Sequence, residues 1–143
     1  MNAPLTKQTL SLKDPSLLRQ QCYVDGRWCD ADGGATIPVV NPATGALLGT
    51  IPRMGTAETR RAIDAANAAW GAWKAKTGKE RSTVLRKWFD LMMANADDLA
   101  AIMTSEQGKP IAEAKGEIAY AASFIEWFAE EGKRLYGDVI PGH

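Results

Sequence analysis

Two cysteines and a single histidine are the side chains of this sequence best suited to nucleophilic or metal chemistry. They are Cys22, Cys29 and His143, and the histidine is the last residue. One imidazole and two thiols cannot supply the four ligands of a structural zinc site. An imidazole at a chain end is also a poor member of a Cys–His or Ser–His–Asp system. Neither of the two common phosphate-binding glycine loops occurs. These residues therefore predict no catalytic and no cofactor-binding residue in the chain.

The two cysteines flank a segment that is typical of a tight β-hairpin. Asp25-Gly26, between apolar and aromatic residues, is a preferred pair for a two-residue type I′ turn. Folding back on this turn places Cys22 opposite Cys29, with Cα atoms about 4.5–5.5 Å apart, a spacing that a disulfide can bridge. In a cytoplasmic protein we expect two reduced thiols. The pair also lacks the C-x-x-C spacing and the basic neighbours that mark a redox site.

Composition restricts the class of protein. The chain has 143 residues, 17 basic and 17 acidic side chains, 45% hydrophobic and 24% charged residues, which is typical of one globular domain. A net charge of zero argues against a nucleic-acid-binding protein. No apolar run approaches the roughly 20 residues of a membrane helix, and the N-terminus has no secretory signal pattern. We therefore expect a soluble, cytoplasmic domain.

The predicted secondary structure that must position these residues changes from strands to helices near Gly55. Residues 1–20 show no core pattern, which predicts an extended or loosely docked arm. After the hairpin, residues 36–40 predict a strand in which Pro38 requires an edge or a bulge. The turn 41–45 and a returning strand at 46–51 follow. These hairpins are too small to be stable alone.

Beyond Gly55 the pattern indicates helices. The first helix is predicted to have Thr56 as its N-cap, and the second begins with a capping box at Thr77 and Glu80. We expect Asn95 to interrupt the second helix and Gly108 to end the third. The fourth has Pro110 in its first turn and ends at Gly137. The side chains predicted to face a core are Ile63, Ala66, Trp70, Trp73, Val84, Leu85, Trp88, Leu91, Met92, Leu99, Ile102, Met103, Ile111, Ala114, Ile118, Ala121, Ile125 and Phe128.

Several strings, in this order, resemble the N-terminal portion of the NAD(P)-dependent aldehyde dehydrogenase superfamily. They are Tyr23-Val24-Asp25-Gly26-Arg27-Trp28, Val40-Asn41-Pro42-Ala43-Thr44-Gly45, Glu80-Arg81, Glu106-Gln107-Gly108-Lys109-Pro110 and Tyr136-Gly137-Asp138-Val139-Ile140-Pro141. The segments 112–118 and 121–131 are similar to the bacterial succinate-semialdehyde dehydrogenase branch. The resemblance covers nearly everything after residue 20.

The resemblance implies an α/β fold in which β-hairpins and three to four helices flank a Rossmann-like cofactor domain whose parallel sheet is not in this chain. Residues 21–143 would be the incomplete N-terminal segment of that domain, after the arm 1–20. The full-length protein would oxidise succinate semialdehyde to succinate with NAD or NADP, in 4-aminobutyrate degradation, and would form a homo-oligomer. The family's nucleophilic cysteine, general base, oxyanion-hole asparagine and cofactor loop lie beyond this chain, so the chain alone is expected to be inactive. One alternative is a free-standing, non-catalytic helical interaction module. Another is an intact small enzyme, which the missing acid and base residues argue against.

The resemblance also implies two sites. In relatives a monovalent cation is held by a backbone carbonyl at the position of Val40 or its neighbour Val39, and by an acidic residue that matches Glu106. Such oxygens suit hard cations, although a lone glutamate is usually a solvated surface residue. Gly116 and Tyr120 match positions that line the aldehyde tunnel. The competing interpretation is close helix packing at Gly116, with Tyr120 as a half-buried core aromatic.

Overall fold

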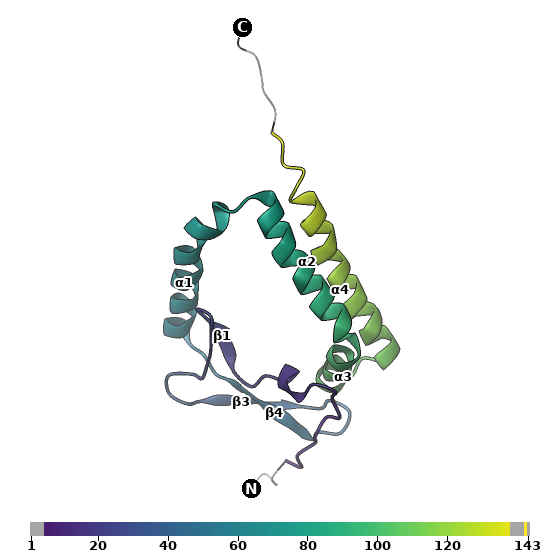
Figure 1. Ribbon diagram of the computed structural model, residues 1–143. Coiled ribbons are helices and arrows are strands. Elements are labelled where there is room, and N and C mark those ends of the chain that lie inside the picture. Colours follow the sequence, from purple (N-terminus) through teal and green to yellow (C-terminus); the bar gives the residue numbers. More distant parts are fainter. Residues whose placement is uncertain (1–4, 138–141, 143) are drawn as a thin grey trace.

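The computed structural model describes residues 5–137 and 142. Its elements are η1 (Pro15–Leu17), β1 (Cys22–Val24), β2 (Arg27–Cys29), β3 (Thr36–Val40), β4 (Leu47–Pro52), α1 (Thr56–Lys74), α2 (Gly78–Ala94), α3 (Ala96–Gln107) and α4 (Ile111–Glu131). The two hairpins lie at one end of the molecule. α1 rises from them on one side, and the α2–α4 group rises on the other (Figure 1). His143 and the string Asp138 to Pro141 lie outside the described residues.

The strands form two separate antiparallel hairpins among the described residues, β1–β2 and β3–β4. In the first, Cys22 pairs with Cys29 and Tyr23 with Trp28, as predicted. Asp25 and Gly26 have φ values of 50° and 75°, the positive values that a type I′ turn requires. In the second, the register shifts between Val39 and Val40, and β4 runs one residue later than the predicted 46–51. Local turn chemistry therefore decides both hairpins.

The N-terminal arm is docked by hydrogen bonds to two distant parts of the chain. Leu47 exchanges backbone hydrogen bonds with Thr6 and Gln8, and Gln20 accepts one from the Thr50 amide at 2.9 Å. The Asp98 carboxylate, 6% exposed, accepts the amides of Lys13 at 3.0 Å and Asp14 at 2.8 Å. Because these bonds join residues between 30 and 85 positions apart, the sequence pattern did not indicate them.

Two of the predicted helix ends are confirmed and three differ. The N-cap of α1 is Gly55 rather than Thr56, because the Glu58 carboxylate accepts the Gly55 amide at 2.9 Å. Thr77 and Glu80 form the predicted capping box of α2, and Gly108 ends α3 at φ 80°. Pro110 is the N-cap of α4 rather than a first-turn residue. α4 ends at Glu131, well before Gly137, and its C-cap is Gly132.

The core lies where α4 packs against α2 and α3, and it is built from small residues. Ala100, Ala114 and Ile118 are buried together, with Ala96, Leu99 and Met103 against them. On α4 the buried positions also include Ala122 and Ala129, whereas the predicted Ala121 and Phe128 are exposed. Alanine allows the helix axes to approach closely, so the buried stripe follows the alanines rather than the larger side chains.

Two predicted core faces remain open among the described residues. α1 has no buried residue, and Ile63 and Trp70 are 62% and 56% exposed. On α2, Leu85 and Met92 are half-buried, whereas Val84, Trp88 and Leu91 are exposed. These apolar stripes were predicted to be inward, and this part of the chain provides no partner that covers them. No helix within residues 5–137 is both long and apolar enough to span a membrane.

Candidate functional site

The proposed tunnel residues lie on the face of α4 opposite its buried stripe. Gly116 and Tyr120 are one turn apart, and Tyr120 is 65% exposed. A Cβ added at Gly116 would meet no atom within 4 Å. Within the described residues, Gly116 therefore makes no close helix contact and Tyr120 is exposed. Both residues instead belong to an open surface that has room for another group.

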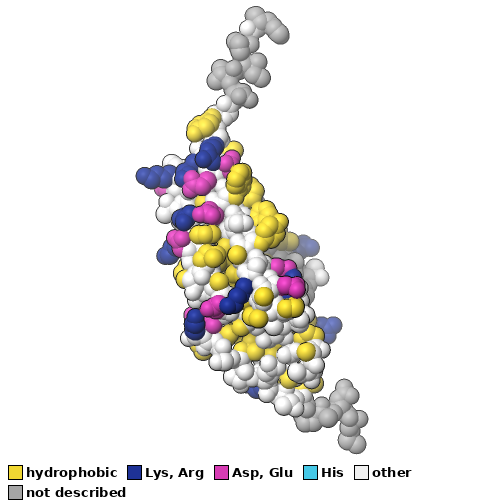
Figure 2. Space-filling model, turned by 90° about the vertical axis from the view of Figure 1, so that its right-hand side faces the viewer, with side chains coloured by type: hydrophobic (Ala, Val, Ile, Leu, Met, Phe, Trp, Pro, Cys, Tyr) yellow, Lys and Arg dark blue, Asp and Glu magenta, His cyan; other side chains and the backbone are white. Residues whose placement is uncertain are grey.

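Aromatic side chains extend this surface along α4. The rings of Tyr120 and Phe124 meet edge to face with centroids 4.8 Å apart, and Trp127 is 63% exposed. Hydrophobic side chains gather on this side of the molecule (Figure 2). Beside them, an open hollow of about 920 Å³ is lined by Arg86, Phe124, Trp127, Phe128, Glu130 and Arg134. The lining of this hollow is mainly apolar, as the walls of small-molecule sites usually are.

The basic side chains beside this hollow are already paired. Arg86 binds Glu126 at 2.7 Å and Asp90 at 3.4 Å, and Lys133 binds Glu130 at 2.8 Å. Asp90, on α2, and Lys133, two residues after the end of α4, help to line a second hollow. Such exposed ion pairs are typical of solvated helix surfaces.

The structure brings together two of the three residues assigned to a monovalent cation. Val39, on β3, and Glu106, in the last turn of α3, line the same small hollow with Gln20 and Thr50. Val40 does not line it. Residues 5–137 contain no group of three or more His, Cys, Asp or Glu side chains arranged to hold a metal ion. A cation there would therefore rely on backbone and amide oxygens beside one carboxylate, which alkali cations accept.

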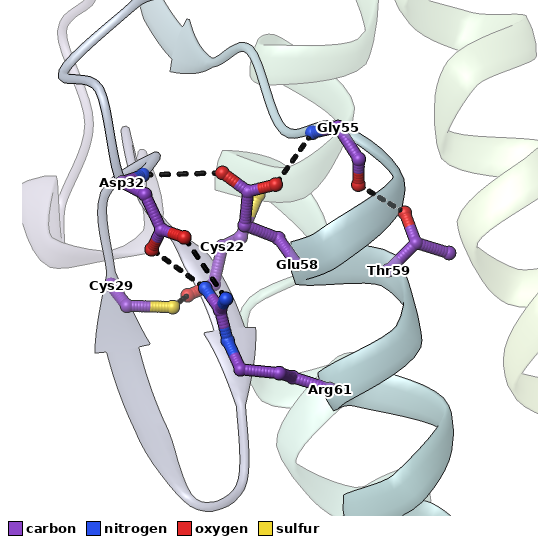
Figure 3. A network of polar contacts seen from close by, with 7 residues as sticks. All are labelled: Cys22, Cys29, Asp32, Gly55, Glu58, Thr59 and Arg61. Atoms are coloured by element: carbon purple, nitrogen blue, oxygen red, sulfur yellow. Dashed lines mark hydrogen bonds and ion pairs between the residues drawn. The ribbon is translucent and has the colours of Figure 1, made fainter.

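A polar network that the sequence analysis missed joins the first hairpin to the start of α1 (Figure 3). Arg61 makes two bonds to the Asp32 carboxylate, at 2.6 Å and 2.9 Å. Glu58 accepts the amides of Gly55 at 2.9 Å and Asp32 at 3.2 Å. Hydrogen bonds from its own amide, then Gly55 and Asp32, lower the pKa of Glu58, and the bond to Asp32 raises the pKa of Arg61. The signal in the sequence was a glutamate three residues after Gly55, the spacing of a capping box.

Both cysteines lie beside this network as free, half-buried thiols. The Cys29 Sγ lies 3.4 Å from the Cys22 carbonyl oxygen, to which it donates. The described residues contain no parallel sheet and no glycine-rich loop that begins a helix, so they do not fit a nicotinamide cofactor. What this part of the chain offers is an open aromatic wall, a small hollow lined in part by Val39 and Glu106, and a pair of thiols.

Known proteins share much of this sequence. The aldehyde dehydrogenase family model matches residues 28–143. The chain is 69% identical over 134 residues to a glutarate-semialdehyde dehydrogenase of Pseudomonas putida. It is 65% identical over the same length to the NADP(+) succinate-semialdehyde dehydrogenase of Escherichia coli. In each case 94% of this chain is covered.

A solved structure shows the same likeness in three dimensions. The succinate-semialdehyde dehydrogenase of Burkholderia pseudomallei has 67% sequence identity to this chain and superposes with a TM-score of 0.90 over 92% of it. The chain spans only 28% of the length of the curated relatives and 27% of that structure. The family match, the sequence identity and the structural superposition cover the same part of the relatives. The chain therefore belongs to the aldehyde dehydrogenase family and corresponds to the N-terminal part of the semialdehyde dehydrogenases that it resembles.

Proposed function

We propose that this chain is the N-terminal part of an NAD(P)-dependent dehydrogenase that oxidises succinate semialdehyde to succinate in 4-aminobutyrate degradation. The observation that carries the proposal is the 65–69% identity to semialdehyde dehydrogenases over 94% of the chain. Glutarate semialdehyde is the second candidate substrate, because one of these relatives is a glutarate-semialdehyde dehydrogenase. The two aldehydes differ by one methylene, a difference that binding pockets distinguish by only about 1–3 kcal/mol.

In this proposal the chain contributes scaffold and one wall of the substrate path. The open face of α4 at Gly116 and Tyr120 would line the aldehyde entrance. Val39 and Glu106 would help to hold a monovalent cation near the β3–β4 hairpin. NAD or NADP would accept the hydride, at a site formed by chain outside these residues.

The first test asks whether the chain alone oxidises the aldehyde or binds the cofactor. Purified as 143 residues, it should neither reduce NAD(P) with succinate semialdehyde nor bind the cofactor, because the described residues form no nicotinamide site. Calorimetric titration with each cofactor measures this directly, and micromolar binding would overturn the proposal. A coding sequence that continues into a cofactor domain supports the enzyme. An in-frame stop supports the alternative, a non-catalytic interaction module.

The second test addresses the tunnel residues in the full-length protein. Gly116→Val should raise KM for succinate semialdehyde and leave KM for NAD(P) nearly unchanged, because only aldehyde binding is obstructed. If Gly116 lines an open entrance, the melting temperature should not fall, because among the described residues nothing lies within 4 Å of a Cβ at this position. A destabilised variant with an unchanged aldehyde KM would remove Gly116 and Tyr120 from the substrate path.

Assembly and location complete the proposal. We expect the full-length protein to be a cytoplasmic homo-oligomer, with its apolar faces on α1 and α2 covered by the remaining chain or by a second subunit. Light scattering during size-exclusion chromatography gives the mass of the purified full-length protein. A monomeric mass would refute the oligomer while leaving the activity proposal intact.

A further inference from the structure

The cysteine pair of the first hairpin takes no part in the proposed function. Cys22 and Cys29 are directly opposed in the β1–β2 register, which the two-residue turn at Asp25 and Gly26 fixes. Both thiols are free and half-buried, so a small molecule can reach them. The Cys29 Sγ already lies against the backbone of Cys22, 3.4 Å from its carbonyl oxygen.

This register meets the Cα–Cα requirement of a disulfide. Opposed residues of an antiparallel pair have Cα atoms about 4.5–5.5 Å apart, inside the roughly 4.4–6.8 Å that disulfides span. Their side chains also leave the same face of the hairpin. The pair closes β1 and β2 at the end opposite the turn.

The surroundings of the pair connect it to α1. The guanidinium of Arg61, on α1, makes two bonds to the Asp32 carboxylate. Asp32 follows Cys29 by three residues, and its amide binds Glu58 of α1. Figure 3 shows the thiols, Asp32, Glu58 and Arg61 as one group.

We propose that Cys22 and Cys29 are a redox-active dithiol that a peroxide oxidises to a cross-strand disulfide. The thiolate of one cysteine attacks a peroxide oxygen, the O–O bond breaks, and a sulfenic acid and one water form after proton uptake. The second sulfur then attacks the sulfenic sulfur, the S–S bond forms, the S–O bond breaks, and a second water leaves. The two thiols together lose two electrons and two protons, and one hydrogen peroxide becomes two waters.

The experiment exposes the reduced 143-residue chain, without denaturant, to a small excess of hydrogen peroxide. Trypsin cleaves after Arg19, Arg27 and Arg53, so Cys22 and Cys29 fall in separate peptides, 20–27 and 28–53. Under non-reducing conditions a disulfide joins these peptides into one species whose mass is their sum minus two hydrogens. We expect the free-thiol count to fall from two to zero, the linked peptide to appear in the monomer fraction, and dithiothreitol to restore both thiols.

Two kinds of variant show whether the register is responsible. In Cys22→Ser or Cys29→Ser, the remaining thiol should accumulate as a sulfenic acid that dimedone traps, because its partner is gone. In the double variant Trp28→Cys with Cys29→Ser, the second thiol moves one residue and points to the other face of the hairpin. This chain keeps two cysteines, and it should form the intramolecular disulfide at least tenfold more slowly.

Three results would overturn the proposal. In the first, peroxide leaves both thiols of the wild-type chain free. In the second, the thiols are consumed only as sulfinic acid or as disulfides between two chains. In the third, the variant with the displaced cysteine closes as fast as the wild type, which would show that closure needs flexibility rather than this register.

Discussion

Asp98 provides a sharp test of how the N-terminal arm is held. Its buried carboxylate accepts the backbone amides of Lys13 at 3.0 Å and Asp14 at 2.8 Å. Asp98→Ala removes both bonds and leaves two partly buried amides without an acceptor. The arm should therefore detach from α3 more often, while the α3–α4 core, to which Asp98 contributes no apolar contact, stays folded.

The size of the effect follows from the two bonds. A hydrogen bond to a charged group contributes about 1.5–3 kcal/mol. Rehydration of the freed amides offsets part of the combined loss, so we expect local docking to weaken by about 2–4 kcal/mol. With about 1.36 kcal/mol for each factor of ten, amide exchange at Lys13 and Asp14 should accelerate roughly 30- to 1,000-fold.

Hydrogen exchange of the full chain, read residue by residue by NMR, measures this acceleration directly. The matched control is Asp97→Ala, the preceding residue in the first turn of α3. Asp97 is exposed and forms surface ion pairs with Lys115 at 2.8 Å and Lys13 at 3.2 Å. Such pairs contribute little in water, so the same two amides should change far less.

Equal acceleration in both variants would refute this reasoning. The arm would then be held by the general attraction between charges rather than by the two hydrogen bonds to the buried carboxylate. Unchanged protection in Asp98→Ala would refute it as well, since the arm would then be held elsewhere, for example at Leu47. Exchange at Leu47, where Thr6 and Gln8 bond, distinguishes these two explanations.

Three further predictions concern a glycine contact, a carboxylate and the exposed surface. Gly78→Ala should destabilise the chain in urea unfolding, because a Cβ there would lie 2.8 Å from the Gly132 carbonyl oxygen. The control Gly71→Ala, where a Cβ meets open space, should stabilise the chain by about 0.5–1 kcal/mol. A Gly78→Ala variant more stable than Gly71→Ala would contradict the contact. Glu58 has a lowered pKa in the fold, so its stabilisation is complete well above the ordinary value of 4.5 and is lost as pH falls through the lower folded value. The melting temperature should therefore fall less between pH 7 and pH 3 in Glu58→Gln than in the wild type, and equal falls would count against the network. The chain alone should bind ANS or self-associate through its exposed α1, α2 and α4 faces, whereas a compact monomer that binds no ANS would favour the interaction module.

Local chemistry made several parts of this molecule predictable from the sequence. Asp25-Gly26 determines a two-residue turn, and the turn determines that Cys22 faces Cys29. Thr77 and Glu80 satisfy each other's amides within one turn, and Gly108 adopts a positive φ that ends α3. Each of these features depends on neighbours within a few positions, so the order of residues is sufficient to predict them.

Tertiary structure decided which surfaces are buried and which distant residues meet. The periodicity of α4 was visible in the sequence, but its alanines rather than Phe128 face α2 and α3, because close helix approach requires small side chains. Val39 and Glu106 line one hollow, and Asp98 accepts the Lys13 amide, only because the second hairpin and the arm fold back on α3. Composition and spacing describe what a face can bury. Whether it is buried depends on a partner surface that reaches it from elsewhere in the chain, and for α1 that surface is not among the residues described.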